Sequence, residues 1–286
     1  MQSEISLEQR ITSAFAELSH AHQQLARHIL NNGLFVAFAS AAELGEKAGV
    51  SAATVVRFCQ TIGYTGYPEL QAAARTMLPT YVHKVHQMEQ GRGLLRKREI
   101  ARRVFELDAQ NLNRTSELLD LERFQMAVTT LGKASDVLVV AGGLSAGPAL
   151  YLAHSLKVMG FNARSVLNGG IPLALELAHL KPTSILVAIS VWRYVAETVQ
   201  AMERAQSIGA TRLAITDSLV SPLAQRADYA FQVATDGVAH ALSLTGAMSL
   251  INALIAALSF ALPAKTASAL RAVDTAYRAS KLVIIE

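Results

Sequence analysis

Five short runs rich in β-branched residues, separated by amphipathic stretches, are the feature that most constrains the fold of this chain. Each run has the length of a buried strand, and the stretches between them have the length and apolar spacing of helices. Parallel strands joined by crossover helices produce this alternation, because helices cover both faces of such a sheet. The pattern therefore predicts an α/β domain with a five-stranded parallel sheet flanked by helices. The predicted strands are 137–140, 163–167, 185–189, 213–215 and 229–233.

Residues before 136 have a different pattern, in which apolar side chains recur at helical spacing. Leu7, Ile11 and Leu18 follow this spacing, as do Leu25 and Ile29. A length of 286 residues suits two domains. We therefore predict an all-α N-terminal domain over 1–78, a linker and connecting helix over 79–119, and the α/β domain over 120–286.

A helix-turn-helix pattern lies over residues 40–62. Ser40 with Glu43 three residues later forms a capping box, which marks the start of a first helix. Gly49 suits the left-handed conformation that ends this helix, and Ser51 can cap the next one. Any α-hairpin with a glycine turn has the same outline, so this alternative stays open. In a DNA-binding element the second helix enters the major groove. Its outer side would carry Ser51, Ala52, Ala53, Thr54, Arg57 and Gln60, and the predicted DNA-binding residues are Ser51, Ala53, Thr54 and Arg57.

Composition and local patterns narrow the functional class. The apolar fraction of 51% with 17% charged residues suits a well-filled core. The segment 251–262 comes closest to an apolar span but is too short to cross a membrane, and the N-terminus lacks the signal-peptide pattern. A single cysteine, Cys59, and the absence of metal-ligand spacings or a Walker loop give no indication of a metal or a cofactor. We therefore expect a cytoplasmic protein without membrane, metal or cofactor partners.

The helix-turn-helix stretch resembles the N-terminal domain of RpiR-type transcription regulators. This resemblance implies a helix-turn-helix that binds operator DNA as a dimer, with Ser51, Thr54 and Arg57 on the DNA. It also implies that Tyr64 and Tyr67 pack in the turn after the second helix. The matching residues are 39–44, 49–51, 53–58 and 63–70.

The second domain resembles the SIS (sugar isomerase) domain, which in RpiR-type proteins senses phosphorylated sugars or their relatives. One matching piece is a strand followed by a turn that contains Gly143 and Ser145. Such a turn lets the backbone approach an anion, although two glycines also fit an ordinary strand–helix turn. A second matching piece, 213–228, adds Thr216 and Ser218 to the predicted site, and Asp217 is expected to be a cap.

The segment after the third predicted strand departs from the SIS pattern. Many SIS domains have Ser-x-Ser-Gly-x-Thr at this point, which wraps a phosphate. Here Ser190 is kept, but Trp192 and Arg193 stand in place of the second serine and the glycine. Because a guanidinium can hold a carboxylate or phosphate bidentately, Ser190 and Arg193 join the predicted effector site. The alternative is that Trp192 and Tyr194 pack the loop against a partner subunit.

These features together predict a transcription regulator that senses a small anionic metabolite, either a phosphorylated sugar or a related carbohydrate acid. A homodimer or homotetramer is expected, assembled through the α/β domains. The alternative is a sugar-phosphate isomerase, which needs a positioned general base. The acids and histidines of the second domain show no diagnostic arrangement, so we expect no catalytic residues. Those considered are Glu176, Glu197, His154, His179 and His240.

Overall fold

The chain consists of two compact units, Met1–Gly91 and Arg92–Glu286. The computed structural model describes residues 6–78 and 99–280. The predicted linker therefore lies largely outside the described residues, whereas the predicted connecting helix lies within them as α8 (Ile100–Glu117).

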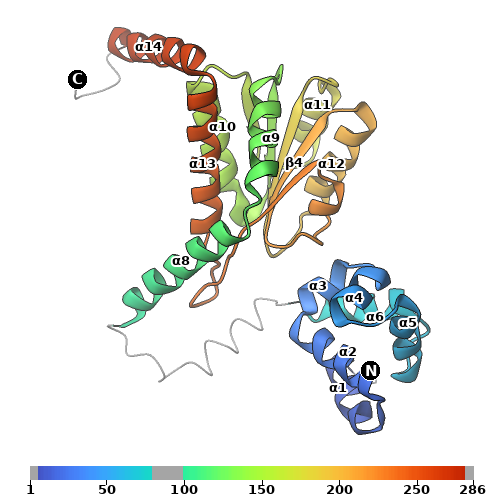
Figure 1. Ribbon diagram of the computed structural model, residues 1–286. Helices are drawn as coiled ribbons and strands as arrows, with labels where there is room; N and C mark the ends of the chain where they lie inside the picture. Colours follow the sequence, from blue (N-terminus) through green and yellow to red (C-terminus); the bar gives the residue numbers. More distant parts are fainter. Residues whose placement is uncertain (1–5, 79–98, 281–286) are drawn as a thin grey trace. The chain divides into compact units, whose positions relative to one another are not determined.

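The described residues of the N-terminal unit form helices joined by short turns, as the apolar spacing predicts (Figure 1). Large side chains from successive helices meet in one core, in which Ile11, Leu25, Leu44, Phe58 and Leu70 are fully buried. Burial of this shared apolar surface holds the short helices together, because helices of this length are marginal alone. The helices are α1 (Leu7–Ala14), α2 (His20–Asn31), α3 (Gly33–Phe38), α4 (Ala41–Ala48), α5 (Ala52–Thr61) and α6 (Tyr67–Thr76).

The C-terminal unit is built on a five-stranded parallel sheet with the order β2-β1-β3-β4-β5, which confirms the predicted fold class. The chain runs from β1 to β2 on one side and then places β3 on the other side of β1. This reversal creates a topological switch point at the carboxyl ends of β1 and β3, the usual place for a ligand in open α/β sheets. The strands are β1 (Val137–Ala141), β2 (Ala163–Val166), β3 (Ile185–Ser190), β4 (Thr211–Thr216) and β5 (Tyr229–Gln232).

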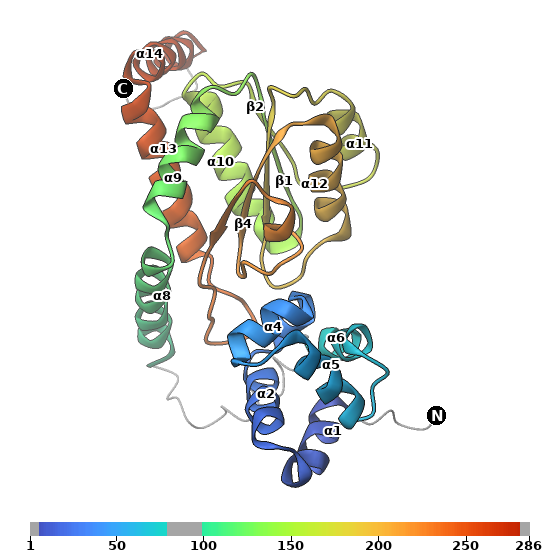
Figure 2. The ribbon, with the colours of Figure 1, turned by 45° about the vertical axis from the view of Figure 1, so that its right-hand side comes forward.

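Helices cover both faces of this sheet (Figures 1 and 2). Alternate strand residues such as Val139, Val187 and Ile215 pack against α9, α10 and α13. Their neighbours Val140 and Leu186 face α11 and α12 on the other side. Because helices cover both faces at the centre of the sheet, β1 and β3 are buried along their whole lengths, whereas the edge strands β2 and β5 are partly exposed. The helices are α9 (Leu121–Gly132), α10 (Ala146–Val158), α11 (Ile171–Ala178), α12 (Ala196–Ile208), α13 (Thr245–Ala261) and α14 (Pro263–Ser280).

Asp136 ties the amino ends of three neighbouring strands together. Its carboxylate accepts hydrogen bonds from the Ser184 hydroxyl at 2.6 Å and from Arg164 Nη1 at 2.9 Å. Arg164 also pairs with the carboxylate of Glu176. Burial alone would raise the pKa of Asp136, but these hydrogen bonds outweigh it and hold the pKa below its ordinary value. The cluster lies at the end of the sheet opposite the switch point and stabilises the fold.

Candidate functional site

The capping pattern predicted at the helix-turn-helix is present. The Ser40 hydroxyl accepts from the Glu43 N–H at 3.2 Å, and the Ser40 N–H donates to Glu43 Oε2 at 2.6 Å. Gly49 ends α4 with a φ of 71°, and the Ser51 hydroxyl accepts from the Thr54 N–H at 3.2 Å at the start of α5. The two helix ends are thus fixed by their own sequence.

The turn between α4 and α5 packs unusually close to the backbone of α4. A Cβ atom at Gly45 would lie 2.7 Å from the carbonyl oxygen of Val50, closer than real Cβ contacts. The Val50 N–H also donates to the Gly45 carbonyl at 2.8 Å. Gly45 therefore lets the turn fold back onto α4, which sets the angle at which α5 leaves.

Helix α5 has one buried face and one exposed face. Val55, Phe58 and Cys59 are buried in the core, whereas Ser51, Ala53 and Arg57 are exposed and Thr54 is half-buried. Three of the four predicted DNA-binding residues are therefore exposed and Thr54 is half-buried. Their contact with DNA stays a prediction.

The two tyrosines after α5 are buried, as the resemblance implies. The Tyr67 hydroxyl donates to the carbonyl oxygen of Ala39 at 2.8 Å, and the guanidinium of Arg10 lies 4.7 Å from the centre of the Tyr64 ring. Both rings therefore connect the helix-turn-helix to the rest of the N-terminal unit.

A pocket of about 300 Å³ lies at the carboxyl ends of β1 and β2, beside the first turn of α12. We call it the strand-end pocket. The segments that follow β1 and β3, the two strands at the switch point, both contribute to its lining. Gly142 and Gly143 form one wall, Asn168 and Gly169 another, and Glu197 and Thr198 a third. Its lining residues include no lysine, arginine or histidine.

The six predicted effector residues lie around the same edge of the sheet, but only Gly143 lines this pocket. Ser145, Ser190, Thr216 and Ser218 are buried at the ends of their strands or in the turns that follow. Three of their hydroxyls make internal hydrogen bonds: Ser190 Oγ to the Arg193 carbonyl, Thr216 Oγ1 to Ser221 Oγ, and Ser218 Oγ with the Val220 N–H. Arg193 is exposed and its guanidinium carbon lies 4.8 Å from the centre of the Trp192 ring. Their contact with an effector stays a prediction.

Asp217 organises the loop between β3 and α12. Its Oδ2 accepts from the Trp192 N–H at 2.8 Å, and its Oδ1 accepts from the Tyr194 hydroxyl at 2.7 Å. Trp192 has a φ of 65°, the one positive value for a non-glycine residue in the described chain. Because this conformation is strained for a bulky residue, the carboxylate has to hold it.

The prediction that Asp217 is a cap is therefore wrong. Its carboxylate instead bonds the segment that follows the neighbouring strand β3, a contact that sequence spacing does not reveal. Burial raises the pKa of Asp217, and the hydrogen bonds from Tyr194 and Trp192 oppose this shift only in part. Burial and the nearby carboxylate raise the pKa of Tyr194 as well.

Glu197 in the strand-end pocket is a second residue that spacing does not single out. It belongs to the first turn of α12, and its Oε1 accepts from the Gly170 N–H at 2.8 Å. A Cβ atom at Gly169 would overlap the Glu197 carboxylate, so only glycine leaves room for this arrangement. The carboxylate is therefore held against the pocket wall by the segment between β2 and α11.

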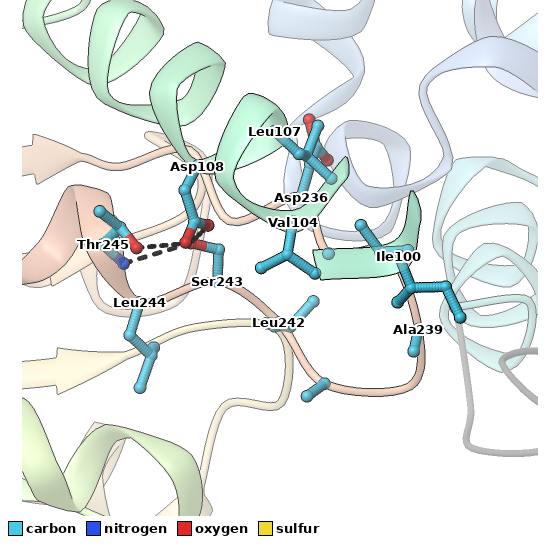
Figure 3. Close-up of a pocket in the computed structure, with 13 residues that line it drawn as sticks. Ile100, Val104, Leu107, Asp108, Asp236, Ala239, Leu242, Ser243, Leu244 and Thr245 are labelled. Atoms are coloured by element: carbon cyan, nitrogen blue, oxygen red, sulfur yellow. Dashed lines mark hydrogen bonds between the residues drawn. The ribbon is translucent and has the colours of Figure 1, made fainter. Parts of the chain in front are cut away.

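A second pocket, of about 330 Å³, lies between α8 and the segment 236–245 (Figure 3). Ile100 and Val104 of α8 face Ala239 and Leu242 of that segment. The same helix is fixed to the segment by polar contacts. Asp108 Oδ1 accepts from the Ser243 hydroxyl at 2.6 Å, and the buried side chain of Asn111 exchanges two hydrogen bonds with the backbone of Asp236.

The described residues 6–78 and 99–280 contain neither a metal-binding cluster nor a single membrane-spanning helix. No group of three or more histidine, cysteine, aspartate or glutamate side chains there is arranged to hold a metal ion. No single helix there has both the length and the apolar character needed to cross a membrane; the pair α13 and α14, bent by 106°, passes this test only when taken together.

A helix-turn-helix unit followed by a parallel α/β unit with a strand-end pocket defines a two-domain DNA-binding regulator. Residues 5–78 match the helix-turn-helix domain of the rpiR family, and residues 130–261 match the SIS domain. The chain is 37% identical to the sugar isomerase domain of an RpiR transcription factor from Sphaerobacter thermophilus, covering 62% of this chain and 99% of that one with a TM-score of 0.61. The chain belongs to the RpiR family of transcription regulators.

Two other proteins are similar over most of the chain. The transcriptional regulator HexR of Pseudomonas aeruginosa is 29% identical, over 77% of this chain and 76% of HexR. The NanR protein of Vibrio vulnificus, solved in complex with ManNAc-6P, is 21% identical with a TM-score of 0.66, covering 95% of this chain and 98% of that one. At this identity, the likeness to NanR shows the fold alone.

Proposed function

We propose that this regulator reads double-stranded operator DNA with the exposed face of α5. Ser51 and Thr54 lie at the start of the helix, where a recognition helix contacts base edges, and Arg57 follows one turn later. Arginine is the side chain that most often reads guanine in the major groove. One observation carries this assignment: α5 has a buried face and an exposed face, and the turn that precedes it is fixed by Gly45 and Gly49. Because its partner is DNA, we place the protein in the cytoplasm.

We further propose that a small anionic carbohydrate, a phosphorylated sugar or a carbohydrate acid, is the effector and binds at the strand-end pocket. Arg193 would hold its anionic group. Arg193 is two residues from Val195, which lines the pocket, so their Cα atoms lie within about 7 Å. Gly143 would contribute backbone to the site, while Ser145, Ser190, Thr216 and Ser218 would support the turns around it. The ManNAc-6P complex of NanR supports a sugar phosphate as the class of ligand.

In the proposed mechanism, dimers or tetramers form through the α/β units and present paired helix-turn-helix units to a palindromic site. The effector would favour one quaternary arrangement over another and so change operator affinity. We propose that the effector is bound and not converted. Glu176, one of the candidate acids for isomerase chemistry, forms an ion pair with Arg164.

In the first step of the test, purified full-length protein selects the DNA fragments that it binds from a pool of genomic fragments. The affinity of the protein for the selected operator is then measured. A panel of sugar phosphates and sugar acids is then screened for thermal stabilisation of the protein, for a change in operator affinity and for turnover. Stabilisation and altered DNA binding without turnover are expected. Isomerisation of a panel member would support the enzyme alternative. Replacement of Arg193 by alanine should weaken effector binding by about 1.5–3 kcal/mol and leave effector-free operator binding unchanged.

A further inference from the structure

Arg10 of α1 bonds the chain where it leaves the helix-turn-helix, although about fifty positions of sequence separate the two. Its Nη1 donates to the carbonyl oxygen of Gly63 at 2.8 Å and, at 3.5 Å, to that of Ile62. Both carbonyls directly follow α5, and a cation at this end of a helix also interacts favourably with the helix dipole. Gly63 has a φ of 85°, and a Cβ atom there would lie 2.8 Å from Arg10 Nη1. A side chain at position 63 would therefore push the guanidinium away from these carbonyls.

Arg75 of α6 bonds the segment through which the chain enters the helix-turn-helix. Its Nε donates to the carbonyl oxygen of Ala37 at 2.8 Å, and its Nη2 donates to Gln71 Oε1 at 2.7 Å. The Gln71 amide in turn donates to the carbonyl oxygen of Ala39 at 2.6 Å. Ala39 directly precedes Ser40, the cap of α4. Arg75 therefore fixes the point at which the first helix of the helix-turn-helix begins.

The two arginines use the same chemistry at the two ends. Each guanidinium lies beside an aromatic ring next to the carbonyls that it bonds: Arg10 is 4.7 Å from the centre of the Tyr64 ring, and Arg75 is 5.8 Å from that of Phe38. A planar guanidinium can stack on a ring and donate in several directions at once, which an ammonium group cannot do. These contacts join parts of the protein and exist without DNA. Arg75 is exposed, so contact with a DNA phosphate is the alternative that an experiment has to separate.

We propose that Arg10 and Arg75 are positioning residues for DNA recognition, which hold the two ends of the helix-turn-helix so that α5 meets the major groove at one angle. A binding constellation has to be held within about 0.5 Å and 10–20° of its productive geometry, whereas attraction to phosphates carries no sequence information and depends little on orientation. Loss of either arginine therefore costs specific binding and leaves non-specific binding intact. This inference rests on the proposed function, because it needs α5 to read operator DNA.

The experiment uses the full-length protein and two labelled duplexes of equal length, the selected operator and a random sequence. Fluorescence anisotropy gives both values of Kd over a range of salt concentrations. Arg10→Ala and Arg75→Ala should each weaken operator binding roughly fivefold to fiftyfold. Affinity for the random duplex should change by no more than about twofold, and the dependence of operator affinity on salt should stay that of wild type, because no phosphate contact is lost.

Arg75→Lys separates positioning from charge. Lysine keeps the positive charge and with it any phosphate contact, but its ammonium group cannot reproduce the fork that bonds both Ala37 and Gln71. This variant should therefore lose nearly as much of the operator-to-random affinity ratio as Arg75→Ala. Arg27→Ala is the matched control, because Arg27 is an exposed arginine of the same unit that lies 5.4 Å from the centre of the Phe15 ring and bonds no carbonyl of the described residues. Its affinity ratio should equal that of wild type.

Circular dichroism and urea unfolding establish which variants are folded at the assay temperature. Arg10→Met and Arg75→Lys, which keep most of the side-chain volume, replace an alanine variant that does not fold. A wild-type affinity ratio in the folded variants would overturn the inference. Equal weakening on both duplexes with a salt slope smaller by about 1 would also overturn it, because the arginines would then be phosphate contacts. Failure of the proposed function shows differently, as a wild type that selects no operator.

Discussion

Replacement of Asp217 by alanine tests how the loop after β3 is held. The substitution removes the acceptor for the Trp192 N–H at 2.8 Å and for the Tyr194 hydroxyl at 2.7 Å. Hydrogen bonds to a charged group contribute about 1.5–3 kcal/mol each. Part of this is offset, because the wild-type carboxylate is buried at a cost that raises its pKa. We therefore expect a net loss of about 2–4 kcal/mol in the free energy of unfolding of the C-terminal unit.

The measurement is simple because Trp192 is the only tryptophan of the chain. Its emission reports on the loop and on the C-terminal unit that carries it. In the Asp217→Ala variant the positive φ of Trp192 is no longer held, so the emission should shift to longer wavelength and acrylamide quenching should increase. Tyr194→Phe removes one of the two hydrogen bonds and should give a smaller effect in the same direction.

Asp120→Ala is the matched control, since it removes an aspartate whose carboxylate caps α9 by accepting from the Arg123 N–H at 2.9 Å. It should cost about 1 kcal/mol and leave the native emission unchanged. If the Asp217→Ala variant shows wild-type emission, quenching and stability, Asp217 does not hold the loop and the reasoning fails.

Three further predictions concern other parts of the chain. Arg57→Ala should weaken operator binding by roughly 1–3 kcal/mol with unchanged thermal unfolding, and an unaltered Kd would remove Arg57 from the interface. Gly45→Ala should destabilise the N-terminal unit by about 1–3 kcal/mol in urea unfolding followed by circular dichroism, because the added Cβ would lie 2.7 Å from the Val50 carbonyl oxygen; the general preference for alanine in helices predicts the opposite sign. The lowered pKa of Asp136 contributes stability that is present above its ordinary value of 3.8 and is lost as the pH falls through the folded pKa. The Asp136→Asn variant should therefore have a smaller free energy of unfolding at neutral pH, and that free energy should fall less as the pH is lowered. An equal fall with pH in both proteins would contradict this.

Local sequence determined the elements and their ends. The capping box at Ser40, the left-handed glycine at position 49 and the cap at Ser51 are confirmed, because each depends on residues within one turn of helix. The strands were also predictable, most clearly β1 and β3, which are short apolar runs buried on both faces of a parallel sheet. The helix-turn-helix and the α/β class follow from these short-range signals.

The site was decided by tertiary structure. Asp217 reaches Trp192 and Tyr194 across 25 and 23 positions of sequence, and Glu197 reaches Gly170 across 27. The order of strands creates these contacts, because β3 lies beside both β1 and β4 and brings their ends to one edge. Sequence spacing indicates which hydroxyls and cations lie near strand ends. Which of them face the pocket, and which are already bonded inside the protein, depends on side-chain packing between segments that the chain order keeps apart.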